Sequence, residues 1–123
     1  MAPKLKESNY SIGVICAIPI ELKAFLAILD EIHLAPDIDD RDANTYNFGR
    51  IGSHNVVIAC LPGGQYGLTN AGIVAARMYL SFKNLKFGLM VGVGGGAPSE
   101  SNDIRLGDLV ISLPTGNSGG VIQ

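Results

Sequence analysis

Short apolar runs alternate with polar, turn-forming segments along this chain. The run over residues 10–17 contains SIGVIC, which is apolar on both faces and rich in β-branched residues, and predicts a buried parallel strand. Pro19 then favours a helix start, and apolar residues at spacings of three and four predict a helix over residues 19–32. Residues 33–44 are acidic and turn-forming, which predicts an exposed loop.

The second half of the pattern predicts a hairpin, a helix and two further strands. The β-rich runs TYNFGRI and HNVVIAC flank Gly52 and Ser53, which is typical of a hairpin. Thr69 is a plausible N-cap for a helix over residues 70–82, whose small residues suit close packing on a sheet. KFGLMVGVGGG, residues 86–96, reads as a buried strand that breaks into a glycine-rich loop, and GDLVISL, residues 107–113, as one more strand.

Strands and helices that alternate in this order predict an α/β fold, with a mainly parallel mixed sheet flanked by helices. We expect residues 1–9 to be a polar N-terminal tail and residues 10–123 to be part of one domain. Ligands of such sheets bind at the carboxyl ends of the strands. Three segments, residues 17–21, 61–70 and 92–98, are therefore expected to line one crevice.

Composition narrows the classes of partner. The 123 residues are 47% hydrophobic, and nine basic against eleven acidic residues give a net charge of −2. No basic run is long enough to follow a phosphate backbone, so we expect no nucleic acid, and no apolar run is long enough for a membrane span. Cys16 and Cys60 lie in apolar runs without CxxC spacing or a metal-ligand partner nearby, which predicts buried free thiols. The N-terminus has too short an apolar stretch for a signal peptide, so we expect a reducing, cytoplasmic location. Neither a metal nor an organic cofactor is implied.

Glu21 is the candidate catalytic residue, because it falls in the first turn of the helix that follows the first strand. A carboxyl group there can act as an acid or base, although the pattern alone favours the simpler interpretation that it complements the helix dipole. GVGGGA at residues 92–97 fits a loose dinucleotide pattern, but Pro98 follows at once and no helix is predicted after it. His33 and His54 fall at a helix end and a hairpin turn, and both are expected on the surface.

Four segments together carry a resemblance: GVICAIPIELKAF, PGGQYGLTNAG, LMVGVGGGAPS and DIRLGDLVIS. They resemble the nucleoside phosphorylase and nucleosidase superfamily of the purine and uridine phosphorylase type, and above all the fungal domains that often precede ankyrin, tetratricopeptide or NTPase regions in receptor-like proteins. The resemblance covers residues 10–123, the N-terminal portion of that domain. It implies a three-layer sandwich in which Glu21 activates the attacking water. It also implies a nucleoside site lined by Ala17, Ile18, Gly63, Gly67, Gly94 and Gly95.

The departures from this family favour hydrolysis over phosphorolysis. Met90 and Val93 stand where phosphorylases carry the arginine and serine that hold phosphate, and an apolar side chain cannot supply charge-assisted hydrogen bonds. The family's ribose-binding glutamate and purine-protonating aspartate lie in a second half that this sequence lacks. We therefore expect a fragment that is inactive alone, from a domain that cleaves a purine nucleoside or nucleotide.

Two alternatives remain open at this point. The domain is a non-catalytic ligand-sensing or signalling module of a repeat-containing receptor, or it is an incomplete sheet whose exposed edges associate with another copy, giving a homo-oligomer.

Overall fold

The computed structural model describes residues 2–38, 41–42, 44–62, 67–92, 99–101, 105 and 107–111. The chain divides into two compact units, Met1–Val93 and Gly94–Gln123. All the described helices and strands lie in the first unit. In the second, residues 107–111 form no strand, so the strand predicted over residues 107–113 is wrong at these positions. Leu109 is 85% exposed there, and the backbone N–H of Asp108 donates to the carbonyl of Arg105 in a local turn rather than to a strand.

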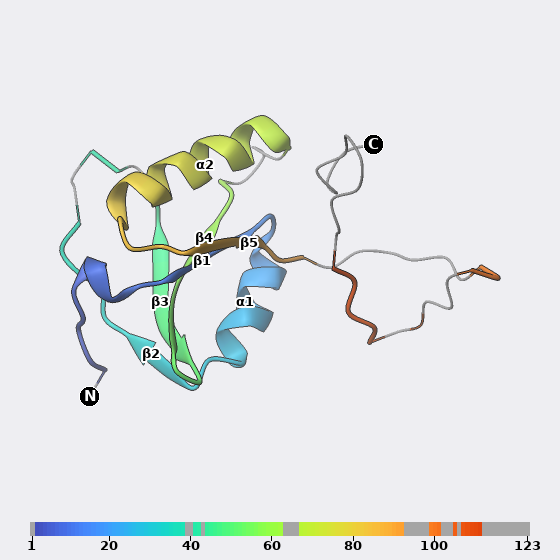
Figure 1. Ribbon diagram of the computed structural model, residues 1–123, viewed down its shortest axis with the longest axis horizontal. Helices are drawn as coiled ribbons and strands as arrows, with labels where there is room; N and C mark the ends of the chain where they lie inside the picture. The colour runs from blue at the N-terminus through green and yellow to red at the C-terminus, as the bar shows by residue number, and fades with distance from the viewer. Residues whose placement is uncertain are drawn as a thin grey trace. The chain divides into compact units, whose positions relative to one another are not determined.

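The first unit is built on a five-stranded sheet with the order β2-β3-β4-β1-β5 (Figure 1). Its strands are β1 (Ile12–Cys16), β2 (Glu31–His33), β3 (Tyr46–Ile51), β4 (His54–Cys60) and β5 (Phe87–Met90). β1 runs parallel to both β4 and β5, whereas β3 runs antiparallel to β2 and β4. The predicted α/β class is confirmed. The sheet is mixed, with a parallel half that carries β1 at its centre.

Two helices cover opposite faces of this sheet (Figure 1). α1 (Pro19–Ala27) packs Leu22 and Phe25 against Val14 and the other residues of that face. α2 (Leu68–Ser81) packs its own apolar residues against the second face, in a cluster that includes Ile15, Val57, Ala59, Ala71, Val74, Met78 and Phe82. Neighbouring residues of a strand point to opposite faces, which is why β1 and β4 supply both clusters.

The segment after α1 departs from the sequence prediction. α1 ends at Ala27 rather than at residue 32, and residues 31–33 form β2, which pairs with β3. His33 is consequently buried, with only 6% of its surface exposed, and the prediction of a surface histidine is wrong. Its Nδ1 lies 3.0 Å from the hydroxyl of Tyr10 and its Nε2 lies 2.8 Å from Oε1 of Glu31. These two partners satisfy both ring nitrogens, as burial requires.

The first nine residues, which were expected to form a polar tail, contact the rest of the fold. The backbone N–H of Leu34 donates to the carbonyl of Pro3, and Leu5 packs on the aromatic side of the core. A short 3₁₀ helix, η1 (Glu7–Asn9), then leads into the fully buried Tyr10.

The predicted hairpin and second helix are confirmed. β3 and β4 are joined through Gly52, whose φ of 58° lies in the left-handed region that glycine adopts without strain. α2 begins at Leu68 rather than at residue 70, and its N-cap is Gly67 rather than the predicted Thr69. β5 forms as predicted but as an edge strand, and all four of its residues are exposed rather than buried.

Candidate functional site

The parallel strands β4, β1 and β5 end side by side at one edge of the sheet, their carboxyl edge. Cys16 is the register partner of Cys60, and Ile15 that of Met90. The pairing extends past the strands, because Leu61 N–H donates to the carbonyl of Cys16 and Val91 N–H to that of Ile15. The segments that follow these three strands therefore leave the sheet at neighbouring points. The sequence predicted this neighbourhood for residues 17–21, 61–70 and 92–98, and of the last segment the structure describes Gly92.

Glu21 lies at this edge with only 8% of its surface exposed. It is the third residue of α1, whose N-terminal turn follows β1 after two residues. Its Oε1 accepts hydrogen bonds from the backbone N–H groups of Ala17, at 2.9 Å, and Ile18, at 3.2 Å. The second of these is one half of a capping box, and the positive end of the helix dipole further favours a carboxylate here.

Gly92 faces the same carboxyl group from the end of β5. A Cβ built on Gly92 would lie 2.8 Å from Oε2 and 3.4 Å from Cδ of Glu21. A Cβ contact as short as 2.8 Å essentially never occurs, so a side chain at position 92 would displace the carboxylate. The start of the glycine-rich segment thus comes against Glu21 because it lacks a side chain.

Two thiols lie near this carboxylate, and both are free. Cys16 is fully buried, as predicted, whereas Cys60 is only partly buried. Burial raises the pKa of Cys16 to about 11, and Cys60 and Glu21 act in the same direction. Burial and the charge of Glu21 also raise the pKa of Cys60. Both thiols are therefore protonated at neutral pH and are poor nucleophiles.

The structure brings together three of the predicted site residues, Ala17, Ile18 and Glu21. It gives the first two a different role from direct ligand contact, since their N–H groups hold the glutamate. Gly67 caps α2 with a φ of 109°, a conformation that side chains rarely adopt. Gly63, Gly94 and Gly95 lie outside the described residues.

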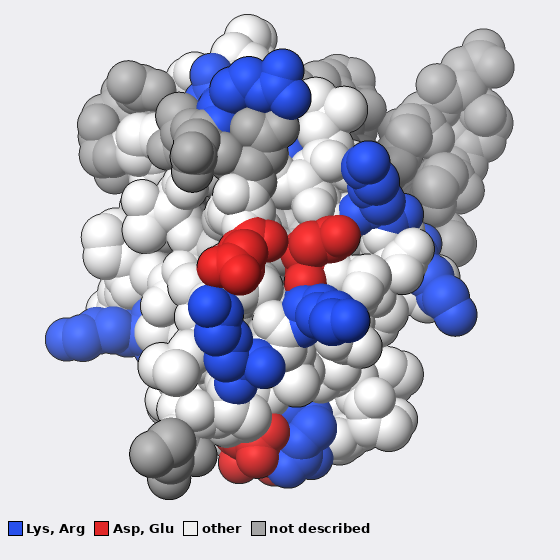
Figure 2. Space-filling view, turned by 90° about the vertical axis from the view of Figure 1, so that its left-hand side faces the viewer, with Lys and Arg blue, Asp and Glu red and all other residues white. Residues whose placement is uncertain are grey.

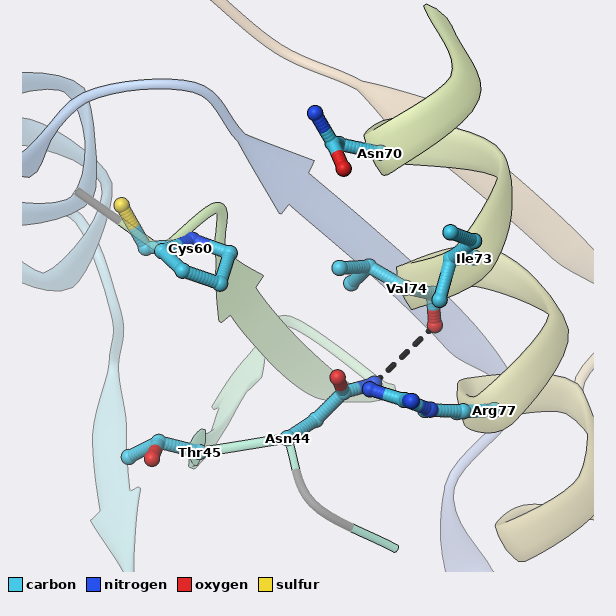
Figure 3. Close-up of a pocket in the computed structure, with 8 residues that line it drawn as sticks. Asn44, Thr45, Cys60, Asn70, Ile73, Val74 and Arg77 are labelled. Carbon is cyan, nitrogen blue, oxygen red and sulfur yellow. Dashed lines mark hydrogen bonds between the residues drawn. The ribbon is translucent and has the colours of Figure 1, made fainter. Parts of the chain in front are cut away.

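A hollow of about 450 Å³ opens between α2 and the residues just before β3 (Figure 3). Asn70, Ile73, Val74 and Arg77 of α2 form one wall, and Asn44 and Thr45 form the other. The end of β4 and Pro62 close the hollow on the sheet side. Pro62 and Asn70 belong to the segment 61–70 that was expected to line a crevice, whereas no sequence motif pointed to the wall formed by Asn44 and Thr45.

Surface charge adds no extended field of one sign on the face drawn in Figure 2, where basic and acidic side chains are interspersed. Ion pairs join Lys4 to Asp37, at 3.2 Å, and the partly buried Arg50 to Glu31, at 3.7 Å. Among the described residues, no three His, Cys, Asp or Glu side chains gather in a way that would hold a metal ion. Neither described α-helix is long and apolar enough to cross a membrane.

Comparison with known proteins gives one informative relative. A protein of Hyaloscypha variabilis, named nucleotide-binding leucine-rich repeat (NLR)-like protein, is 53% identical over 122 residues. The match covers 98% of this chain and 12% of the relative. No family model matches the chain, and no solved structure does. The chain is thus similar to one short section of a much longer protein, and the resemblance to nucleoside phosphorylases stays a prediction.

Sequence reasoning placed Glu21 correctly but missed its partner. Gly92 belongs to the predicted glycine cluster, yet nothing in the pattern distinguished it from Gly94 or Gly95 as the residue that faces the carboxylate. The buried pair of His33 and Tyr10 was also missed, since 23 residues separate them.

Proposed function

We propose that the complete domain cleaves the N-glycosidic bond of a purine nucleoside or nucleotide by hydrolysis, with Glu21 positioning and activating the water. One observation carries this proposal: a buried carboxylate, held by two backbone N–H groups, lies at the carboxyl end of the central parallel strand and faces a glycine. This edge is where α/β sheets bind their ligands. The family resemblance supports the same role for Glu21.

Hydrolysis of this bond requires two groups from the protein, a base for the water and an acid for the departing purine base. The water oxygen forms a bond to C1′ of the sugar while the bond between C1′ and the base nitrogen breaks, and a base must take the proton that water loses. A carboxylate held at fixed geometry suits that task, because little reorganisation is needed as positive charge develops on the sugar. The departing base also needs a proton from an acid, which the resemblance places in a second half of the domain. We therefore expect the 123-residue chain to be inactive alone.

Water is a better candidate nucleophile than phosphate here. Met90, which ends β5 at this edge, stands where the resemblance implies a phosphate-binding arginine. Its thioether is a weak acceptor and carries no charge, so it cannot bind a phosphate dianion.

A second candidate function is a non-catalytic ligand-sensing module. The capping contact of Glu21 with Ile18 is a structural role that explains its burial without catalysis. The NLR-like name of the relative is compatible with a receptor, in which this section would sense a ligand rather than convert it.

Release of free base separates the two functions. The chain, and a version extended to a full domain, are incubated with purine nucleosides and nucleotides with and without phosphate, and free base is measured by chromatography. A nucleosidase releases base only from the extended form, without requiring phosphate, and Glu21→Gln abolishes the release whereas the exposed-site control Glu100→Gln does not. Binding of a nucleoside without any release would establish the sensing module instead.

A further inference from the structure

We propose that the hollow between α2 and the residues before β3 binds a small organic oxyanion, a phosphate monoester or a carboxylate, through Arg77. This site is independent of the glycosidic chemistry proposed for Glu21. Three properties of the hollow support this proposal: a fixed wall, a guanidinium that makes no ion pair with a described residue, and a volume suited to a small molecule.

The wall opposite α2 is fixed by hydrogen bonds. Nδ2 of Asn44 donates to the backbone carbonyl of Val74, at 3.1 Å, and to the hydroxyl of Tyr46, at 2.9 Å. The backbone N–H of Asn44 donates to Asp42, whose carboxylate also accepts from the Tyr46 and Ser81 hydroxyls. Two hydrogen bonds thereby connect the segment before β3 to α2, one from Asn44 to Val74 and one from Ser81 to Asp42.

This arrangement determines what Asn44 offers to a ligand. A side-chain amide has two N–H donors, and Val74 and Tyr46 take both of them. Its Oδ1 is left as an acceptor, and Figure 3 shows that oxygen directed into the hollow. The wall therefore presents a hydrogen-bond acceptor of fixed orientation.

Arg77 supplies the charge. It is the one charged side chain among the described residues that line the hollow, and it extends from α2 toward the Asn44 wall (Figure 3). Within the described residues it makes neither a hydrogen bond nor an ion pair. The carboxylate of Asp42, whose charge also acts on Tyr46, accepts hydrogen bonds from Tyr46, Ser81 and the Asn44 backbone, and no ion pair joins it to Arg77 among the described residues. A guanidinium with five donors and no partner favours an oxyanion, which it can bind through two parallel hydrogen bonds.

The remaining surface and the size define the rest of the ligand. Ile73 and Val74 provide apolar contacts, and a volume of about 450 Å³ falls within the range of small-molecule sites. An inorganic ion would leave most of that space unfilled. The ligand thus carries an oxyanion for Arg77, an apolar body for α2, and a donor for Oδ1 of Asn44.

The test is an NMR titration of the 123-residue chain, labelled with ¹⁵N, that follows the Arg77 Nε–H and Asn44 side-chain signals. The probes are N-acetylphenylalanine as a carboxylate, phenyl phosphate as a phosphate monoester, and N-acetylphenylalaninamide as the uncharged counterpart. We expect at least one anion to bind roughly tenfold or more tightly than the amide, since a charge-assisted contact contributes that much. The preferred anion identifies the headgroup.

Variants show whether Arg77 is responsible. Arg77→Gln is expected to remove the preference for the anion, Arg77→Lys to retain part of it, and Lys83→Gln, an exposed cation outside the hollow, to leave it unchanged. The backbone spectrum of each variant verifies its fold, and Arg77→Lys still tests the charge if Arg77→Gln unfolds. The proposal is overturned if no anion shifts these signals, if the amide binds equally well, or if both Arg77 variants bind like the parent chain. Loss of nucleosidase activity in Glu21→Gln with unchanged anion binding would leave this site standing.

Discussion

Replacing Glu21 by alanine tests whether this carboxylate is a structural anchor as well as a candidate base. Two backbone donors, from Ala17 and Ile18, lose their acceptor in Glu21→Ala. A hydrogen bond to a charged group contributes about 1.5–3 kcal/mol net. The Ile18 bond is the longer of the two and Ile18 is 37% exposed, so water replaces part of that contact. We expect the free energy of unfolding to fall by about 2–4 kcal/mol.

Glu21→Gln separates charge from hydrogen bonding. The amide oxygen can still accept from both backbone N–H groups, while the favourable interaction of a negative charge with the helix N-terminus is lost. That interaction contributes about 0.3–1 kcal/mol, so we expect a loss of about 1 kcal/mol, which leaves the protein folded for activity measurements.

Urea unfolding followed by circular dichroism measures both changes, with the exposed Glu100→Ala as a matched control that should stay within about 0.5 kcal/mol of the parent chain. A Glu21→Ala variant as stable as that control would refute the anchoring role. Stabilisation of the fold would then not explain why the carboxylate is buried, and the catalytic role proposed for Glu21 would explain it instead.

Further predictions concern packing and titration. Gly49→Ala should lower the free energy of unfolding by about 1–3 kcal/mol, because its Cβ would lie 2.6 Å from both the backbone oxygen of Glu31 and Cδ1 of Leu29. Gly72→Ala, inside α2 with open space around it, should instead raise that free energy by up to about 1 kcal/mol, and a loss of stability in urea melts would contradict the packing described. The Cys16 thiol holds its proton more tightly when folded than when unfolded, so stability should fall as pH rises from near 9 to about 11, and a flat profile in the wild type relative to Cys16→Ala would contradict this.

Local signals were sufficient for much of the fold. Gly52 between two β-rich runs predicted the hairpin, and the small residues after Thr69 predicted α2. Glu21 was placed correctly because a strand, a proline and a helical stripe follow one another within about a dozen residues. In each case the residues that determine the structure are neighbours in the sequence.

Long-range pairing decided the features that were missed. A three-residue strand such as β2 shows no periodicity, and it forms because β3 offers it an antiparallel edge. His33 can be buried because the hydroxyl of Tyr10, in another part of the chain, forms a hydrogen bond with its Nδ1. The helix expected to run to residue 32 ends early for the same reason, since β2 takes the residues that would extend it.

The contact between Gly92 and Glu21 has a consequence for how this sequence can evolve. A mutation that adds a side chain at position 92 is costly while the carboxylate occupies its present place, yet it becomes tolerable once position 21 carries a smaller residue. The two positions, 71 residues apart, should therefore show epistasis. Lineages in which a smaller residue replaces the glutamate would no longer require glycine at position 92.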